Sequence, residues 1–422
     1  MTSPVGDGSN PRVALVVTSG SYRVAAFLTA ADRCGVELTV ATDAELPLIE
    51  SVTIDLGETR SSAAAIAEAG PFTSVIAPDD AGVAIAAEAA ALLGLSQNSP
   101  LSIARTRNKA MMRDALTAVV PQPRTWVVER GADVEAIIAN FGGPCVIKPV
   151  SRSGSQGVIR INDPKEAEAV IERVRRILAV TGGNPNEALL LEEYIDGEEV
   201  AVEGVIESGG FRLLAIFDKP DPLNGPYFEE TLYVTPSRHH PEVLTELERT
   251  TSMICDTLGL VSGPVHAEFR IVSGRVVVLE VAARSIGGQC GQALSFSGLS
   301  LEELLIMNSL GRDLPIAPPS TASGILMLPI PASGQLLSTQ GVVEASAVPG
   351  ITGVEIFIAL GSRVVALPEG NRYLGFVFAT GRDPEEVEAS LRAAGELIAF
   401  DIHPDTDRVD PPVLPRTLRP HE

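Results

Sequence analysis

Cysteine and aromatic residues are scarce in this sequence. The four cysteines, Cys34, Cys145, Cys255 and Cys290, lie far apart among apolar neighbours. They form no Cys-x-x-Cys pair and no cluster with histidine, which argues against a zinc site. We therefore expect buried thiols in a reducing cytoplasm. Aromatic residues make up only 4% of the chain, so alanine, valine and leucine must fill most core positions.

Basic residues are also few. The chain has 32 Lys and Arg against 54 Asp and Glu, which gives a formal net charge of −22. A nucleic-acid-binding protein would carry a basic face, so we expect no nucleic-acid partner. The most apolar window, Ala81–Leu95, contains Glu88 and lacks flanking basic residues, so no membrane span is expected. Residues 1–12 show no secretory signal, and we expect a cytoplasmic protein.

The composition that remains is typical of a globular protein. The chain has 422 residues, 45% of them hydrophobic, which is enough for two or three packed lobes. Near its start, the apolar run Val13–Thr18 is followed by a turn with glycine, a helical pattern over 22–34 and a second apolar run, Val36–Ala41. This order predicts a βαβ unit in a parallel sheet. Because the dinucleotide fingerprint GxGxxG is missing, a small carboxylate or simple packing suits the turn better.

A lysine stands directly before a loop rich in glycine and serine. The apolar run Cys145–Ile147 leads to Lys148, the loop covers Ser151–Gly157, and a second apolar run, Val158–Ile161, follows. Glycine permits positive φ, and successive backbone N–H groups in such a loop can bind an anion. The pattern predicts a phosphate site between two antiparallel strands. An ordinary hairpin with an exposed lysine is the alternative.

A basic cluster precedes this loop. Residues 100–120 have the pattern of one helix, which carries Arg105, Arg107, Lys109 and Arg113. Cations at this density can serve a phosphate or a carboxylate. A solvated helix face is the alternative.

Several carboxylates lie within apolar segments after the glycine-rich loop. The strand pattern of Ala188–Tyr194 ends in Glu192-Glu193, and Glu199 opens the next apolar run. The segment Asp218–Arg238 contains Glu229 and Glu230, and it is either a loop over a site or a long surface excursion.

A second hairpin carries two more carboxylates. His266–Ile271 and Val276–Val281 both alternate between apolar and polar residues around a Ser-Gly turn. Glu268 and Glu280 are therefore expected close together on neighbouring strands. Two such carboxylates repel unless a cation lies between them, and oxygen ligands suit Mg²⁺. Exposed strand carboxylates are the alternative. Arg284 and a Gly-Gly turn follow directly.

Short strands and one helix are expected at the C-terminal end. The helix opens with Asp383-Pro384, and the chain from His403 is rich in proline and expected to be irregular. The expected strands are Gly324–Leu328, Val354–Leu360, Ser362–Ala366 and Leu374–Thr380.

Taken in order, these motifs resemble the ATP-grasp superfamily, and its carboxylate–amine ligases in particular. The resemblance runs from about residue 12 to 400, and its specific motifs lie within 105–290. Residues after 320 resemble the closing domain of bacterial L-amino-acid ligases (dipeptide synthetases). The implied fold class is α/β and α+β multidomain, an ATP-grasp fold with an N-terminal Rossmann-like parallel-sheet domain. The implied parts are a disordered N-terminus (1–11), the parallel α/β domain (12–104), a lid subdomain with the glycine-rich loop (105–205), a subdomain with the metal site (206–317), a closing α+β domain (318–405) and a Pro-rich tail (406–422).

The resemblance also implies roles for single residues. Lys148 and Arg284 would be catalytic, and Glu268 and Glu280 would hold Mg²⁺, with Mn²⁺ as the alternative. Ala282 stands where most of the superfamily has Asn, so the number of metal ions stays open. The implied ATP-binding residues are Lys109, Lys148, the lid residues Ser153, Gly154, Ser155, Gln156 and Gly157, the adenine hinge Glu192, Glu193, Tyr194 and Ile195, and Glu199 for the ribose. The implied substrate-binding residues are Arg284, Gly287, Gly288, His266, Glu229 and Glu230.

The implied activity is ATP-dependent amide formation. A carboxylate would become an acyl-phosphate, and an amine would then displace phosphate, in a product resembling a dipeptide. The alternatives are a carboxylase that activates bicarbonate, a phosphotransferase that stops at the phosphorylated product, and a non-catalytic nucleotide-binding protein. The expected partners are a small carboxylate, such as an amino acid, and an amine, and homodimers are common among such ligases. The sequence does not identify the substrates, although Gln289 and Cys290 stand where size selection is expected.

Overall fold

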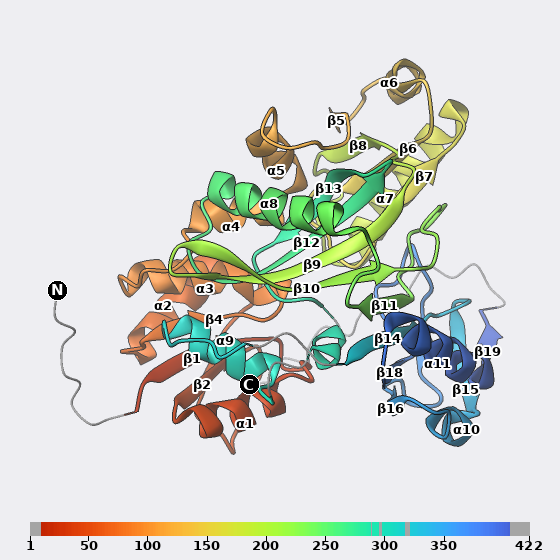
Figure 1. Ribbon diagram of the computed structural model, residues 1–422. Helices are drawn as coiled ribbons and strands as arrows, with labels where there is room; N and C mark the ends of the chain where they lie inside the picture. Colours follow the sequence, from red (N-terminus) through yellow and green to blue (C-terminus); the bar gives the residue numbers. More distant parts are fainter. Residues whose placement is uncertain (1–9, 288, 295–297, 317–320, 406–422) are drawn as a thin grey trace, which may run out of the picture.

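The computed structural model describes residues 10–287, 289–294, 298–316 and 321–405, arranged around four β-sheets (Figure 1). The expected disordered N-terminus, residues 1–11, lies outside this range except for Asn10 and Pro11, and so does the whole of the expected Pro-rich tail, residues 406–422. Gly288 also lies outside it.

The N-terminal part is built on a parallel sheet, as predicted. Its four strands lie in the order β3-β2-β1-β4, and both β2 and β4 pair with β1 in parallel. The carboxyl ends of these strands face the centre of the molecule, where α3 begins. The elements are β1 (Arg12–Val16), α1 (Val24–Cys34), β2 (Glu37–Thr42), β3 (Ser51–Thr53), α2 (Thr59–Ala69), β4 (Ser74–Ile76) and α3 (Asp80–Leu92).

The prediction of a single helix over residues 100–120 is wrong. Two helices occur instead, α4 (Pro100–Arg107) and α5 (Lys109–Leu116), and Asn108 between them is extended, with φ −107° and ψ 106°. The Asn108 side chain accepts hydrogen bonds from two backbone N–H groups of α5, which is the role that asparagine favours at a helix start. The break makes Lys109 the first residue of α5, beside the glycine-rich loop.

A four-stranded sheet in the order β5-β8-β6-β7 carries this loop. Strands β6 and β7 pair antiparallel with Cys145 opposite Ile161, which confirms the expected hairpin. Asp163 caps a short 3-10 turn, Pro164–Glu166, and a helix follows directly from Ala167. The elements are β5 (Thr125–Val128), α6 (Val134–Phe141), β6 (Cys145–Pro149), β7 (Ile159–Ile161), α7 (Ala167–Val180) and β8 (Leu189–Glu193).

An eight-stranded sheet, β13-β12-β9-β10-β11-β14-β18-β16, runs through the rest of the molecule. The antiparallel pair of β11 and β14 joins its two halves, with Tyr233 opposite Ile325. The middle and C-terminal parts therefore share one sheet. Its elements, with the helices between them, are β9 (Glu198–Glu207), β10 (Gly210–Lys219), β11 (Leu232–Thr235), α8 (Pro241–Leu258), β12 (Gly263–Val272), β13 (Arg275–Ala282), a 3-10 turn (Cys290–Ala293), α9 (Leu301–Ser309), β14 (Ala322–Leu328), β16 (Ile351–Ile356) and β18 (Gly375–Gly381).

The C-terminal part adds a three-stranded sheet, β17-β15-β19. The strand expected at Val354–Leu360 ends at Ile356, so Phe357 and the residues after it form a connection. His403 belongs to a strand, against the expectation of irregular chain, because β19 pairs with β15. The elements are β15 (Gly334–Gln340), α10 (Val342–Ser346), β17 (Arg363–Val364), α11 (Pro384–Leu397) and β19 (Ala399–Pro404).

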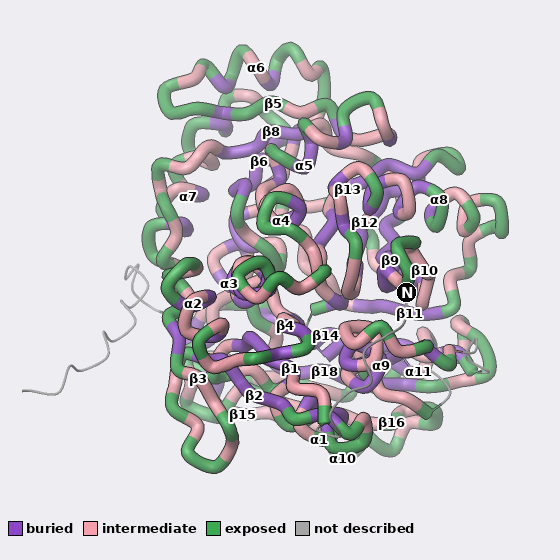
Figure 2. The backbone as a smooth tube through the Cα atoms, turned by 90° about the vertical axis from the view of Figure 1, so that its left-hand side faces the viewer, coloured by how far each residue is buried: buried purple, intermediate pink, exposed green. Residues whose placement is uncertain are grey.

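Buried residues follow the central strands, whereas α6 at one end of the molecule is mostly exposed (Figure 2). All four cysteines are free thiols; three are buried and Cys34 is half-buried, so the expectation of buried thiols holds fully for three. Burial raises the pKa of Cys145 to about 11 and that of Cys255 to about 12. None of the described helices is both long and apolar enough to cross a membrane.

Candidate active site

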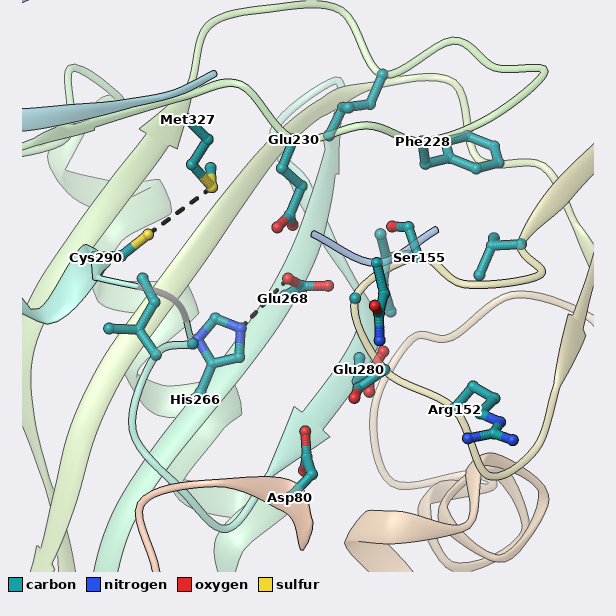
Figure 3. A pocket seen from close by; sticks show the side chains of 18 of the residues that line it. Asp80, Arg152, Ser155, Phe228, Glu230, His266, Glu268, Glu280, Cys290 and Met327 are labelled. Carbon is teal, nitrogen blue, oxygen red and sulfur yellow. Dashed lines mark hydrogen bonds and ion pairs between the residues drawn. The ribbon is translucent and has the colours of Figure 1, made fainter. Parts of the chain in front are cut away.

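One large cavity, of about 790 Å³, lies where the parts of the chain meet (Figure 3). Its walls come from the carboxyl edge of the N-terminal sheet, the glycine-rich hairpin, strands β12 and β13, and the C-terminal part. Asp80, Lys148, Glu268 and Tyr373 represent these walls in turn, and Arg284, just after β13, also lines the cavity. Residues far apart in sequence thus line one cavity.

Lys148 is fixed at this cavity by a buried carboxylate. Its Nζ lies 2.5 Å from Oε2 of Glu192, whose Oε1 accepts a hydrogen bond of 2.6 Å from Nε of Arg113. Burial acts to raise the pKa of Glu192, but the two cations outweigh it and lower that pKa to about 2. Burial lowers the pKa of Lys148, with Arg113 and Lys109 adding to the effect. Both oxygens of Glu192 therefore contact cations of the protein itself.

Lys109 connects the lid to the second hairpin. Its Nζ lies 3.0 Å from Oε1 of Glu280 and donates a 2.6 Å hydrogen bond to the carbonyl oxygen of Arg152. Its own backbone N–H donates to the carbonyl oxygen of Val150. Lys109 and Lys148, predicted from separate motifs, therefore line the same cavity.

The lid loop divides its contacts between the cavity and the C-terminal part. Ser153, Gly154 and Ser155 line the cavity, whereas Gln156 and Gly157 do not. The Gly157 N–H donates to the carbonyl oxygen of Pro368 over 3.0 Å, and Nε2 of Gln156 donates to that of Glu369 over 2.9 Å. The positive φ values of Gly154, Ser155 and Gly157 turn these groups in the two directions. Sequence reasoning did not predict this contact.

An apolar and aromatic wall lies on the hinge side. Glu193, Tyr194 and Ile195 line the cavity together with Val146 and Leu279. The Arg160 guanidinium lies over the Tyr194 ring, 3.9 Å from its centroid. Such a wall suits a flat heterocycle such as adenine.

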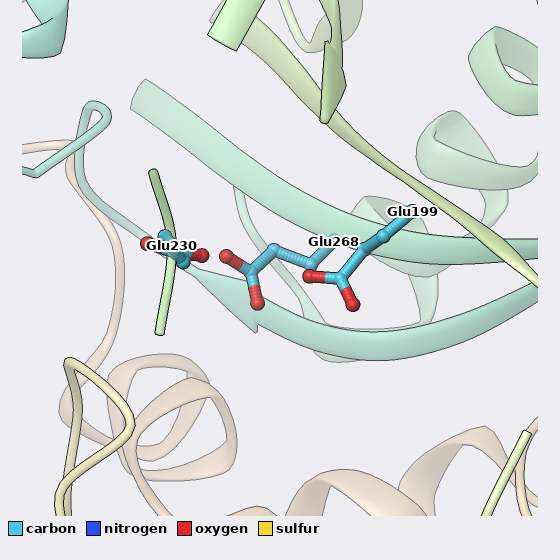
Figure 4. Close-up of side chains that lie close together, drawn as sticks. All are labelled: Glu199, Glu230 and Glu268. Atoms are coloured by element: carbon cyan, nitrogen blue, oxygen red, sulfur yellow. The ribbon is translucent and has the colours of Figure 1, made fainter. Parts of the chain in front are cut away.

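Glu268 and Glu280 are direct cross-strand partners on β12 and β13, as predicted. The cation beside Glu268 is Lys219, a residue that sequence reasoning missed. Its Nζ lies 2.7 Å from Glu199, 2.6 Å from Glu230 and 3.0 Å from Glu268, whose carboxylates lie next to one another in Figure 4. Burial opposes the charge of Lys219, but the three carboxylates raise its pKa well above the ordinary value. The buried ammonium lies among all three carboxylates and takes the place that a cation would fill, so we assign no metal to the centre of this cluster.

The predicted metal pair keeps its access to the cavity. The Glu268 and Glu280 side chains are 19% and 25% exposed, against 4% for Glu192 and 8% for Glu199. Their oxygens are the donors that Mg²⁺ prefers, so the residues present fit a magnesium ion. Ala282 lies opposite His266 in the strand register and offers no side-chain ligand.

Arg284 is held by a carboxylate that sequence reasoning also missed. Its Nε donates a 2.9 Å hydrogen bond to Oδ2 of Asp80, at the start of α3. Burial acts to lower the pKa of Arg284, but the Asp80 carboxylate outweighs burial and raises that pKa above its ordinary value. In turn, Arg284 and a hydrogen bond from the lid residue Ser153 lower the pKa of Asp80 against the effect of burial. The position of Asp80 at the carboxyl edge of a parallel sheet was the available signal.

Both ring nitrogens of His266 face a carboxylate, Glu203 on one side and Glu268 on the other. Its Nδ1 is hydrogen-bonded to Glu203, and its Nε2 lies 3.3 Å from Oε1 of Glu268. Burial acts to lower the pKa of His266, but Glu203 and then Glu268 raise it to about 10, so the ring is cationic. Glu203 also accepts a 3.0 Å hydrogen bond from the backbone N–H of Ile286. This buried glutamate, absent from the sequence-based set, links His266 to the loop after Arg284.

Only some of the other predicted substrate-binding residues lie at the cavity. Glu230 and Gly287 line the cavity, whereas Glu229 does not. Burial raises the pKa of Glu229. Gly288 lies outside the described residues.

Two family models match the chain. A model described as an ATP-grasp domain matches residues 141–293, and one described as L-amino acid ligase C-terminal domain 2 matches residues 326–403.

Curated relatives match over part of their length. Dapdiamide A synthase of Enterobacter agglomerans is 31% identical over 46% of this chain and 46% of its own. Alanine–anticapsin ligase of Bacillus subtilis (strain 168) is 28% identical over 53% of this chain and 51% of its own. An uncharacterized protein, y4rH, of Sinorhizobium fredii is 26% identical over 74% of this chain and 64% of its own. The chain thus spans between about half and two thirds of the length of these relatives.

Solved structures share the fold over nearly the whole chain. The L-amino acid ligase from Bacillus licheniformis has a TM-score of 0.78 at 24% identity and covers 94% of this chain and 99% of its own. Phosphoribosylglycinamide synthetase from Anaerococcus prevotii has a TM-score of 0.68 at 12% identity and covers 94% of this chain and 100% of its own. The chain therefore contains an ATP-grasp domain at residues 141–293, which is followed at residues 326–403 by a C-terminal domain of the L-amino acid ligase type.

Proposed function

We propose that the protein is an ATP-dependent ligase that joins the carboxylate of an amino acid to an amine and releases ADP and phosphate. The observation that carries the proposal is the single cavity, which unites the phosphate-type lysines, the Glu268–Glu280 pair and Arg284 with residues of the C-terminal domain. The names of two similar proteins, dapdiamide A synthase and alanine–anticapsin ligase, support it.

In the first step, a carboxylate oxygen of the substrate attacks the γ-phosphorus of ATP. The bond from that phosphorus to the β–γ bridging oxygen breaks, which leaves an acyl-phosphate and ADP. Lys109 and Lys148 bind phosphate oxygens and neutralise their charge, while the lid loop excludes water. A magnesium ion held by Glu268 and Glu280 would supply further charge neutralisation at the phosphates.

In the second step, the amine nitrogen attacks the acyl carbon. The bond from that carbon to the phosphate oxygen breaks, phosphate leaves, and the nitrogen loses a proton to the surroundings. Arg284, which lines the cavity, stabilises the negative charge of the intermediate. No protein nucleophile is required, because positioning and charge stabilisation carry both steps.

The experiment that tests the proposal measures phosphate release from MgATP with amino acids, singly and in pairs, and records the product masses. Release that needs two amino acids, with a product mass equal to their sum less water, is the expected result. Release that depends on bicarbonate alone, or binding of ATP without turnover, would overturn the proposal.

The metal assignment predicts the effect of Glu280→Gln. The variant should lose roughly 10²–10³-fold in kcat, as for removal of a group that stabilises charge in the transition state. Its turnover should also require more magnesium for half-saturation. Glu207→Gln is the matched control, since Glu207 lies at the far end of β9 and pairs with Arg212 outside the cavity. Full turnover in Glu280→Gln would contradict the assignment.

A further inference from the structure

We propose that the amino acid whose carboxylate is activated carries a large apolar side chain. That side chain would lie in the aromatic end of the cavity, which we define by Tyr22, Phe357, Tyr373, Phe376, Met327 and Cys290. The inference rests on the proposed function and adds the class of one substrate.

Aromatic residues are gathered here in a chain that has few of them. Only 4% of the residues are aromatic, yet the rings of the aromatic end form a connected group. The centroid of Phe376 lies 5.6 Å from that of Phe357 and 5.8 Å from that of Tyr373. Tyr22, from the N-terminal part, lies 6.4 Å from Phe357. The group therefore spans two parts of the chain and closes one side of the cavity.

Two of these rings present apolar surface, whereas Phe376 is buried. Phe357 is 45% exposed and Tyr22 47% exposed, although both line the cavity. An apolar ligand group that covers these faces would remove their surface from water, which favours binding. The Sγ of Cys290 and the Sδ of Met327 lie 4.0 Å apart on the same wall. Methionine adapts to the shape of an apolar ligand and makes favourable contacts with aromatic rings.

The aromatic end lies on the side of the site where the activated carbon is expected. Figure 3 shows Cys290 and Met327 on one side of His266 and Glu268, and the lid residues Arg152 and Ser155 on the other. Ile286, which lines the cavity, follows two residues after Arg284. A carboxylate held at Arg284, with its phosphate toward the lid, would thus have its side chain toward the aromatic end.

Two carboxylates, Glu230 and Asp79, line the cavity near this end. Glu230 lies close to Tyr233 and Tyr373, and it raises the pKa of both after the larger effect of burial. Asp79, also in the lining, accepts a hydrogen bond from the Ser21 hydroxyl. Lys219 balances the charge of Glu230, whereas Asp79 would repel a second carboxylate on the substrate and attract a free α-ammonium group. Both effects favour an amino acid with an apolar side chain.

The experiment compares phenylalanine, leucine, alanine and glutamate as acyl donors with MgATP and a fixed amino acid as the amine. Tandem mass spectrometry of the product identifies the donor, because the donor becomes the N-terminal residue. The expected kcat/KM for phenylalanine or leucine is at least about 10-fold above that for alanine, since a large side chain buries several more methylene equivalents. Equal or higher values for alanine or glutamate would overturn the inference.

The variant Phe357→Ala tests the position of the side chain. The ratio of kcat/KM for phenylalanine to that for alanine should fall about 3- to 10-fold, the range expected for loss of one aromatic contact. Leu360→Ala is the control, because Leu360 is 62% exposed in the same connection and does not line the cavity. An unchanged ratio in Phe357→Ala, or an equal fall in Leu360→Ala, would overturn the inference. A wild-type protein that ligates no amino acid would refute the proposed function instead.

Discussion

At the scale of single residues, the cavity depends on buried ion pairs in which one carboxylate positions one or more cations. Glu192 holds Lys148 and Arg113, and Asp80 holds Arg284. Each carboxylate keeps a cation at the wall without occupying the space that a phosphate would fill. A buried pair of this kind adds little net stability, but its disruption leaves an uncompensated charge.

Glu192→Gln should therefore destabilise the fold strongly. The change leaves Lys148 and Arg113 buried without a negative charge, and we expect a loss of about 3–5 kcal/mol in the free energy of unfolding at pH 7. Urea unfolding measures the loss. Glu193→Gln is the matched control, since Glu193 pairs with the exposed Arg124 and should cost less than about 1 kcal/mol. Similar losses for the two variants would contradict this account.

The same pair predicts how the difference depends on pH. The folded pKa of Glu192 is about 2, below its ordinary value of 4.5, so ionised Glu192 stabilises the folded state above pH 4.5. That contribution is lost as the pH falls through the folded pKa. The gap between the wild type and Glu192→Gln should thus close between pH 4.5 and about 2. A gap that stayed constant over this range would show that charge is not its cause.

The sequence indicated some of the charged residues at the cavity but not others. Lys148 stands out because it precedes a glycine-rich loop, and Glu268 and Glu280 because they alternate with apolar residues in a hairpin. Lys219 and Glu203 gave no such signal, since each is a charged residue within an apolar strand whose partners are distant in sequence. The roles of the predicted site residues stay predictions until ligands or variants are measured.

At the scale of elements, the lid loop and the connection between β17 and β18 form one unit. Two lid groups donate to the carbonyl oxygens of Pro368 and Glu369, and Arg173 of α7 pairs with the Glu369 carboxylate over 2.6 Å. The C-terminal domain thus holds the lid over the phosphate end of the cavity. Neither segment has a pattern that predicts this contact from sequence.

Glu369→Ala should loosen the lid with little effect on stability. The Arg173–Glu369 pair is partly exposed, so its loss should cost less than about 1 kcal/mol in unfolding free energy. A looser lid admits water to the acyl-phosphate, so the ratio of ADP formed to amide product should rise above one. Glu386→Ala, which removes an exposed pair with Arg382 on α11, should leave the ratio unchanged. A ratio of one in both variants would contradict a role for this contact.

Local patterns predicted the elements best where one signal dominated. The glycine-rich hairpin and the parallel βαβ unit are where the sequence indicated. The helix expected over 100–120 failed because the same helical pattern continues on both sides of Asn108. Asparagine is a strong helix start signal, and the break could have been predicted from it.

At the scale of the whole molecule, one sheet joins the ATP-grasp domain to the C-terminal domain. Strand β11 has β10 on one side and β14 on the other, and its residues Leu232, Tyr233 and Val234 are fully buried. Pairing between strands so distant in sequence leaves no local pattern, which is why the sequence indicated the two parts but not their shared sheet.

A chain that ends at Thr321 should therefore fail to fold cooperatively. Without β14 the large side chains of β11 meet water, at about 1.5–3 kcal/mol each, against a total stability of about 5–15 kcal/mol. Urea unfolding followed by circular dichroism and by fluorescence of Trp126 should show no single shared transition. A chain that ends at Asp405 keeps every described element and is the control. Coincident, steep transitions in the shorter chain would contradict this account.

The four thiols have a practical consequence for studies of lid movement. Burial raises the pKa of Cys34, Cys145, Cys255 and Cys290, so each is mostly protonated at neutral pH and a poor nucleophile. A maleimide dye would therefore react faster with a cysteine placed on the lid by Ser155→Cys than with any native thiol. The protein is thus suited to fluorescence measurements of lid closure without removal of its own cysteines.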